Sequence, residues 1–358
     1  MRKRLWQLHS WLGLIAGLGL ILIGVSGSML VFHDELDAVF TPDAISVTPT
    51  QEGRLPLDTL LYKAEEQLPD YEVTGWLVRR DQPHFSDTLY LIRHNTTEWQ
   101  VATIDQYNGK ILSSPASQDQ KLYGWLLKFH YEFFADDIGI FICGLLSVAL
   151  FLLGVSGIYL HRKFWKHLFT LRWKNARRIF FSDLHKAVGI WSALFNLILG
   201  FTGAYWNFAH VIEHLSGHEY PQPTFTQRLY PETLSLENVM ADAAKQLPGF
   251  QTNFISLPSN PDSPIIVLWG SVPSRNPFRD SFGTTLSYDP KTGQHTTTAD
   301  IRDAGIGRQI VDMFRPLHYG NFGGLPIKIL WCIGGLTPGV LAVTGFVMWW
   351  QRTRQKRK

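Results

Sequence analysis

The sequence has few of the residues that build compact metal or nucleotide sites. Only two of its 358 residues are cysteines, Cys143 and Cys332, and both lie within apolar runs. This placement excludes a disulfide framework and a cysteine zinc cluster. No Cys-x-x-Cys-His motif is present, so covalent attachment of c-type haem is excluded. The chain also lacks a Gly-x-Gly-x-x-Gly turn after a strand and a Gly-x-x-x-x-Gly-Lys-Ser/Thr loop, which excludes the common nicotinamide, flavin and ATP modules.

Charge is sparse in four parts of the chain. No charged residue occurs in residues 11–32, 138–160, 187–208 and 329–350. At about 1.5 Å per residue, each run is long enough to cross a hydrocarbon core of ~30 Å. The sequence therefore predicts a membrane protein with four transmembrane helices, although its mean hydropathy is only −0.03. The overall net charge of +3 argues against nucleic acid as a partner.

The basic residues are concentrated in three segments that flank these runs. Residues 1–10, 161–186 and 351–358 hold 16 of the 33 Lys and Arg residues and one acidic residue, Asp183. By the positive-inside rule these segments are cytoplasmic, so both termini are expected inside a bacterial inner membrane that the chain crosses several times. Residues 33–137 and 209–328 are then expected in the periplasm.

The chain is a tandem duplication. Leu8-His9 matches Leu184-His185 at an offset of 176, and Phe129-His130-Tyr131 matches Leu317-His318-Tyr319 at an offset of 188. Between them, residues 57–69 match residues 236–248 at an offset of 179. Each copy therefore consists of a helix, an outer lobe and a second helix. The predicted fold class is a membrane protein with an all-α four-helix transmembrane core and two small periplasmic α+β lobes.

Each outer segment has the pattern of a small α+β lobe. Amphipathic helices are expected over Leu57–Leu68 and Leu236–Leu247, and each ends at a Leu-Pro pair. Stretches of β-type alternation follow at Tyr71–Val78, Thr88–Arg93, Phe254–Leu257, Ile265–Trp269 and Thr284–Tyr288.

Four histidines occupy equivalent positions in the two copies. His9 and His185 precede the first and third runs on the inner side, and His130 and His318 precede the second and fourth on the outer side. An axis along the membrane normal that relates two parallel halves places each pair together. Imidazoles on facing helices hold haem iron from both sides. The alternative is that these histidines only pack or form hydrogen bonds at the level of the lipid headgroups.

Three further histidines lie at the ends of runs without a histidine at the duplicate position. They are second-rank candidates for haem ligands: His161, His33 and His210. His161 ranks first among them because it shares the cytoplasmic level with the inner pair. The glycines of the runs favour close helix packing, with contact to the flat face of a macrocycle as the alternative.

The fourth run has an unusual beginning. Gly320, Gly323, Gly324 and Pro326 precede it, and Pro338 lies inside it. Because proline and glycine interrupt helices, we expect the fourth helix to start late or to be broken. His318 is then expected on a short helix of its own.

These features resemble the PepSY-associated transmembrane helix family of bacterial inner-membrane proteins. The resemblance rests on five motifs: Leu8-His9-x-Trp11-Leu12-Gly13, Gly24-x-x-Gly27, the second copy from Leu184-His185 to Gly203, the turn Tyr288-Asp289-Pro290-x-Thr292-Gly293, and Leu317-His318-Tyr319-Gly320. It covers nearly the whole chain and implies that the two outer lobes are PepSY lobes.

Some members with this layout look like ferric-siderophore reductases that carry two b-type haems. The resemblance implies one haem held by His9 and His185 and a second held by His130 and His318. It also implies a quinol or a separate reductase as electron donor, and a periplasmic ferric siderophore that releases Fe(II) on reduction. Two other functions stay open: a sensor or inhibitor whose lobes bind a protein partner, and a membrane subunit that delivers electrons to a separate partner.

Overall fold

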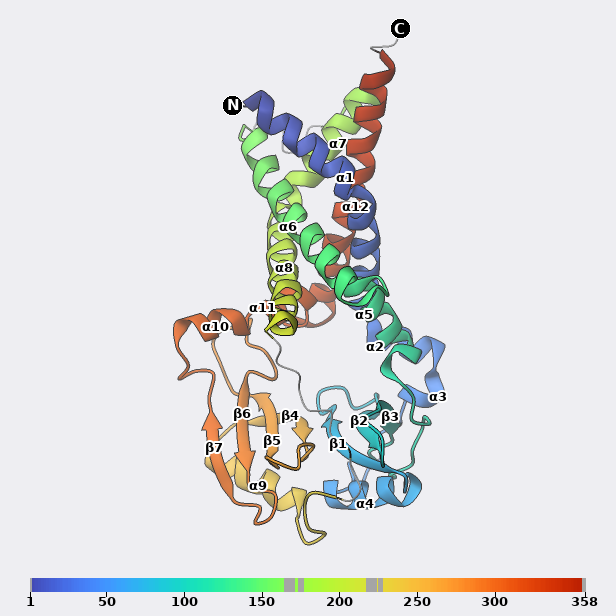
Figure 1. The fold of residues 1–358 in the computed structure, drawn as a ribbon, viewed down its shortest axis with the longest axis vertical. Helices are drawn as coiled ribbons and strands as arrows, with labels where there is room; N and C mark the ends of the chain where they lie inside the picture. Colours follow the sequence, from blue (N-terminus) through green and yellow to red (C-terminus); the bar gives the residue numbers. More distant parts are fainter. Residues whose placement is uncertain (1, 164–170, 173–176, 217–223, 225–227, 356–358) are drawn as a thin grey trace. The chain divides into compact units, whose positions relative to one another are not determined.

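The computed structural model describes residues 2–163, 171–172, 177–216, 224 and 228–355. The chain forms two compact units (Figure 1). We call the first the helical unit; it comprises Met1–Phe32, Leu126–His218 and Phe314–Lys358. We call the second the sheet unit; it comprises His33–Trp125 and Glu219–Met313. Parts of the predicted cytoplasmic loop 161–186 and tail 351–358 lie outside the described residues.

The helical unit is built from long apolar helices. Three of them, α1 (Arg2–Leu30), α6 (Asp136–Leu160) and α12 (Gly324–Gln355), are each long and apolar enough to cross a membrane. Helices α7 (Arg177–Trp191) and α8 (Ala193–Leu215) meet this criterion together, with a bend of 63° between them. The described part of the chain therefore has three such helices, or four if the bent pair is one span. A helix suits this setting because it satisfies its own backbone hydrogen bonds in lipid.

The third apolar run, expected as a single helix over residues 187–208, is broken at Ser192. The Ser192 hydroxyl donates to the Val188 carbonyl at 2.8 Å and accepts from the Asn196 side chain at 2.9 Å. A serine that bonds to the carbonyl one turn back tends to bend a helix. Hydropathy does not reveal such a bend. As a result, His185 lies on α7 and most of the apolar run lies on α8.

Short helices precede α6 and α12 and carry two of the four paired histidines. His130 lies on α5 (Leu122–Glu132) and His318 on α11 (Phe314–Tyr319). The expected separate helix for His318 is confirmed, because α12 begins only at Gly324. The alternative of a break inside the fourth helix is wrong, because α12 continues through Pro326 and Pro338 to Gln355.

At the junction of α5 and α6, Phe133, Phe134 and the first residue of α6, Asp136, have positive φ angles of 50°, 58° and 47°, which are costly for residues with a side chain. At the other junction, Gly320 and Gly324 have positive φ angles of 69° and 64°. Each short helix is therefore separated from the long helix that follows by a break in the backbone.

The sheet unit contains one antiparallel sheet with the strand order β3-β2-β1-β4-β5-β6-β7 (Figure 1). The strands are β1 (Tyr71–Leu77), β2 (Asp87–Arg93), β3 (Trp99–Ile104), β4 (Gln251–Ser256), β5 (Ile266–Ser271), β6 (Thr284–Tyr288) and β7 (His295–Ala299). Helices α4 (Leu57–Gln67) and α9 (Leu236–Gln246) share one apolar core with the sheet. The shorter helices are α2 (His33–Phe40), α3 (Pro42–Ile45), α10 (Ile306–Asp312) and the 3-10 helix Gln118–Gln120.

The two expected lobes are joined in this one sheet. Strand β1 pairs with β4, and Trp76 lies opposite Ile255, its own equivalent at an offset of 179 in the duplication. A residue that pairs with its equivalent marks a local twofold axis. The helix N-termini repeat this symmetry: Asp58 of α4 accepts the first amide of α9 at 2.6 Å, and Glu237 of α9 accepts the first amide of α4 at 2.5 Å. The sequence patterns predict each lobe separately. They do not predict that a strand edge of one lobe pairs with a strand edge of the other.

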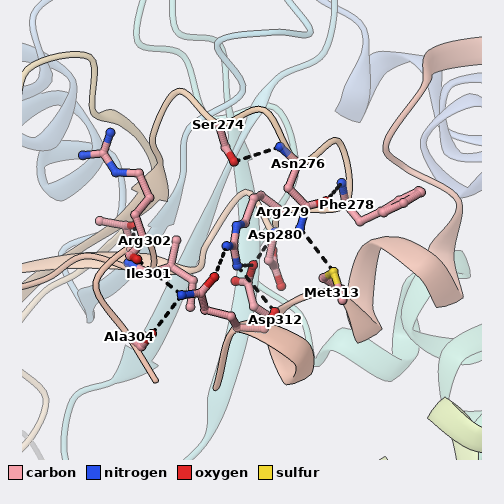
Figure 2. Close-up of polar contacts among 12 residues, drawn as sticks. Ser274, Asn276, Phe278, Arg279, Asp280, Ile301, Arg302, Ala304, Asp312 and Met313 are labelled. Atoms are coloured by element: carbon pink, nitrogen blue, oxygen red, sulfur yellow. Dashed lines mark hydrogen bonds and ion pairs between the residues drawn. The ribbon is translucent and has the colours of Figure 1, made fainter. Parts of the chain in front are cut away.

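A polar cluster ties the loop after β5 to α10 (Figure 2). The Arg279 guanidinium donates to Asp312 Oδ2 at 3.3 Å and to Gln309 Oε1 at 2.5 Å. The backbone amide of Asp280 donates to the same oxygen of Asp312 at 3.3 Å. The side chains of Arg279 and Asp312 are only 14% and 3% exposed, so each needs the other to offset its burial. The cluster therefore orders the segment that directly precedes α11 in the chain.

Strand β1 also carries a buried carboxyl group, Glu72, which is 6% exposed. Arg228 Nε lies 3.8 Å from one carboxylate oxygen and His94 Nε2 lies 3.7 Å from the other. Burial raises the pKa of Glu72 to about 7. The folded chain therefore keeps this proton at pH values where the unfolded chain, with a glutamate pKa of about 4.3, has lost it.

We expect Glu72 to make the sheet unit less stable as pH rises from about 4.5 to 7, with no further loss above pH 7. Glu72→Gln removes this dependence, so its gain over wild type grows from near zero at pH 4.5 to at most about 3 kcal/mol at pH 8. Thermal melting of the full chain in detergent at both pH values measures the difference. Glu66→Gln, on the exposed face of α4, is the matched control. An equal gain at both pH values would contradict the prediction.

Candidate functional site

The helical unit brings His9 and His185 together. His9 lies on α1 and His185 on α7, and their ring centres are 6.4 Å apart with the ring planes at 83°. The two residues are equivalents in the duplication, at an offset of 176. This first pair therefore links the two copies.

The helical unit also brings His130 and His318 together. Their ring centres are 6.3 Å apart and their planes meet at 71°. Trp206 of α8 lies edge-on to the His318 ring at 5.2 Å and also contacts Tyr319, at 5.8 Å between ring centres. This second pair links the two copies again and has aromatic side chains beside it.

Each of the four imidazoles forms a hydrogen bond through Nδ1 with a serine or threonine hydroxyl of another helix. The bonds are His9 to Ser156 at 2.7 Å, His130 to Ser26 at 3.0 Å, His185 to Thr344 at 2.8 Å and His318 to Thr202 at 2.7 Å. Each bond joins residues of the same copy, whereas each imidazole pair joins the two copies. Because every bond uses Nδ1, the Nε2 atom of each ring remains available as a ligand.

A glycine follows each of these hydroxyl residues. At Gly27 an added Cβ would lie 2.7 Å from Cε1 of His130, which is too close for a real contact. At Gly157, Gly203 and Gly345 it would lie 3.6 Å from Cε1 of the histidine that the preceding hydroxyl holds. Gly27 therefore lets the His130 ring approach the backbone of α1, whereas at the other three glycines an added Cβ would make only an ordinary van der Waals contact with the ring.

The second-rank histidines lie elsewhere. His33 begins α2 in the sheet unit, where its Nδ1 is 3.1 Å from Asp34 Oδ1 and its ring centre is 4.5 Å from that of Tyr123. His161 closes the last turn of α6 through its backbone amide. His210 is exposed on α8. Neither imidazole pair includes any of the three.

The two pairs lie at different levels of the helical unit. His9 is part of α1, and the second pair is held to the same helix further along, at Ser26. At about 1.5 Å per residue, the stretch of α1 between His9 and Ser26 separates the levels by roughly 25 Å along the helix axis. This separation is comparable with the ~30 Å thickness of a hydrocarbon core.

The four histidines are evident in the sequence, whereas their hydroxyl partners are not. A signal for the partners exists, because each apolar run contains one Ser/Thr-Gly dipeptide: Ser26-Gly27, Ser156-Gly157, Thr202-Gly203 and Thr344-Gly345. The dipeptides match at the same two offsets as the histidines. Their glycines stand out in a repeat search, but the hydroxyl position alternates between serine and threonine and so is missed.

Both imidazole pairs have the spacing of axial haem ligands. A metal–nitrogen bond of about 2 Å on each side of an iron, with about 1 Å from nitrogen to ring centre, separates the ring centres by roughly 6 Å. The observed separations are 6.4 Å and 6.3 Å. Each pair could therefore hold a haem iron, with the macrocycle supplying the remaining ligands. In the part of the chain that the structure describes, no group of three or more His, Cys, Asp or Glu side chains is placed to hold a metal ion.

Helices that are long and apolar enough to span a membrane, combined with a separate antiparallel sheet, define a membrane protein with a second folded unit. The chain belongs to the family described as PepSY-associated TM region, which matches residues 6–352. The Pseudomonas aeruginosa protein named "Uncharacterized protein PA4219" is 26% identical to it over 261 residues. That match covers 63% of this chain and 63% of the relative's length.

Proposed function

We propose that this protein is an inner-membrane electron-transfer protein that holds two b-type haems and reduces ferric siderophores in the periplasm. The observation that carries the proposal is the presence of two equivalent imidazole pairs, 6.4 Å and 6.3 Å between ring centres. Each of these rings is held through Nδ1 by a hydroxyl. When bound, each haem iron takes up and releases one electron. Imidazole at both axial positions suits electron transfer, because no position is left for a further ligand.

The charge pattern supports a direction for the reaction. His9 follows the basic residues Arg2, Lys3 and Arg4, which the positive-inside rule assigns to the cytoplasm. If α7 and α8 form one span, the core has four spans and both termini lie inside. The first pair then faces the electron donor, a quinol or a separate reductase, and the second pair faces the periplasm.

The chain's own residues would hold the haems and receive the substrate. His9, His185, His130 and His318 would supply nitrogen ligands to the haem irons, and the sheet unit, as a pair of PepSY-type lobes, would dock the ferric chelate. One electron converts Fe(III) to Fe(II), which the hard oxygen ligands of a siderophore bind less strongly. Iron is then released as Fe(II).

The reduced-minus-oxidised absorption spectrum of detergent-purified protein, produced with ample haem, tests the proposal. We expect a low-spin b-type spectrum and about two haems per chain. Because the imidazole planes of the pairs meet at 83° and 71°, the ferric protein should give a strongly anisotropic low-spin electron paramagnetic resonance signal. A ferric siderophore added to the reduced protein should reoxidise the haems, with Fe(II) appearing in a colorimetric trap.

Three outcomes separate the candidate functions. Haem with chelate-driven reoxidation supports the reductase. Haem that a ferric siderophore does not reoxidise indicates delivery of electrons to a separate partner. Protein that binds no haem would overturn electron transfer altogether and leave the sheet unit as a sensor or inhibitor module that binds a protein.

A further inference from the structure

We propose that the hydroxyl residues of the four Ser/Thr-Gly dipeptides are positioning residues that fix the proton of each histidine on Nδ1 and thereby tune the haem potentials. The hydroxyl residues are Ser26, Ser156, Thr202 and Thr344. This inference rests on the proposed function and adds four residues to the site.

The hydroxyl protons are already used within the helices. Each hydroxyl donates to the carbonyl one turn back in its own helix: Ser26 to Leu22 at 2.8 Å, Ser156 to Leu152 at 2.6 Å, Thr202 to Ile198 at 2.7 Å and Thr344 to Val340 at 2.8 Å. A hydroxyl has one proton and two lone pairs. Because the proton is used within the helix, the oxygen acts as acceptor toward the imidazole. Each histidine therefore donates from Nδ1 and keeps a lone pair on Nε2.

Burial makes the loss of these hydrogen bonds costly for the histidines. Ser26, Thr202 and Thr344 are only 3%, 2% and 2% exposed. A buried donor without a partner costs about 1–3 kcal/mol, and water has little access to replace the hydroxyl. Each hydroxyl therefore supplies the acceptor that its histidine needs. At Gly27 the absence of a side chain also leaves space for the His130 ring.

The hydrogen bond also changes the ligand electronically. Donation from Nδ1 makes Nε2 a more basic ligand, and a more basic ligand favours ferric over ferrous iron. Loss of such a partner typically changes metal affinity by 10–100-fold. A tenfold relative loss for Fe(III) corresponds to a rise of about 59 mV in a one-electron midpoint potential. Removing a hydroxyl should therefore raise the potential of the haem that it serves.

Each hydroxyl serves one pair only, which makes the test selective. Thr202 bonds to the second pair and Thr344 to the first. Thr202→Val and Thr344→Val remove the oxygen and keep the shape of the side chain. A redox titration of the full-length protein, followed by absorbance, measures the two midpoint potentials. Thr202→Val should raise the midpoint potential of the haem at the second pair by about 59 mV, which is a tenfold change in the redox equilibrium. Thr344→Val should raise the midpoint potential of the haem at the first pair by the same amount. Thr202→Ser, which restores the acceptor, should return the potential to its wild-type value.

The controls separate this inference from the proposed function. Thr337→Val removes a hydroxyl of α12 that donates to Gly334 and to Asn196, and it should leave both midpoints unchanged. Two bound haems with unshifted midpoints in both valine variants would overturn the positioning role alone, whereas wild-type protein without haem would overturn the proposed function. If a buried valine prevents folding, Ser156→Ala tests the same role at the less buried hydroxyl. An unchanged midpoint there would also overturn it.

Discussion

His130→Ala should remove one of the two haems and abolish ferric-siderophore reduction while the other haem stays bound. In the proposed function His130 and His318 would together hold the second haem, and His318 alone would not suffice. The first pair has its own ligands and hydroxyl partners, at a level roughly 25 Å away along α1. Haem content should fall from about two to about one per chain. The reduction rate should fall roughly 100-fold or more, because even loss of an outer-shell partner costs 10–100-fold.

Two matched variants make this prediction specific. His210→Ala removes an exposed imidazole of α8 and should retain both haems and full reduction. His9→Ala should lose the first haem but keep the second, so chemically reduced protein would still be reoxidised by a ferric siderophore. Two haems per chain in His130→Ala would show that the second pair is not an axial ligand set.

The contacts around the four histidines also explain how the duplication is held together. The hydroxyl bonds join helices of one copy, for example His9 of α1 with Ser156 of α6. The imidazole pairs join one copy with the other. A haem held between two such imidazoles would therefore cross-link the copies at both levels, while the hydroxyls brace each copy internally. The contacts that position the four histidines are therefore also the contacts that hold the two copies of the duplication together.

Much of the candidate site is predictable from the duplication. An offset of 176 relates His9 to His185, and an offset of 188 relates His130 to His318, so the equivalent positions are evident in the sequence alone. The offsets do not give distances. They also do not show that α5 and α11 are separate helices that carry their histidines to the hydroxyls of α1 and α8. That outcome depends on the backbone breaks after each short helix.

The fold, like the site, is only partly predictable from the sequence. The apolar runs predict α1, α6 and α12, because length and hydropathy are sufficient for a membrane-spanning helix. Strand β7 (His295–Ala299) contains mostly threonine and lies at the sheet edge, so it lacks the apolar alternation of a strand with one buried face. Strand β3 (Trp99–Ile104) is buried along four consecutive residues and also lacks alternation. Both strands form through pairing with a neighbour, which a local pattern does not report.

Asp87→Ala should strongly destabilise the sheet unit. Asp87 lies in β2 with no exposed surface, and it accepts hydrogen bonds from both terminal nitrogens of Arg54, at 3.2 Å and 2.5 Å. It also accepts from the Trp76 indole at 2.9 Å and from the backbone amide of Arg79 at 3.0 Å. Alanine would leave a half-buried guanidinium and two further donors without this acceptor. Breaking a buried ion pair in this way costs about 3–5 kcal/mol, a large share of the ~5–15 kcal/mol that stabilises a typical domain.

Limited proteolysis and thermal melting of the full-length protein in detergent measure the effect of Asp87→Ala, and the haem spectrum reports separately on the helical unit. We expect cleavage within the sheet unit and a lower melting temperature, with about two haems retained. Asp81→Ala, an exposed carboxylate before the same strand, should change neither. An unchanged melting temperature in Asp87→Ala would refute the stability argument. If the sheet unit unfolds and ferric-siderophore reduction continues at the wild-type rate, the chelate docks without the sheet unit, because the haems alone then suffice for the reaction.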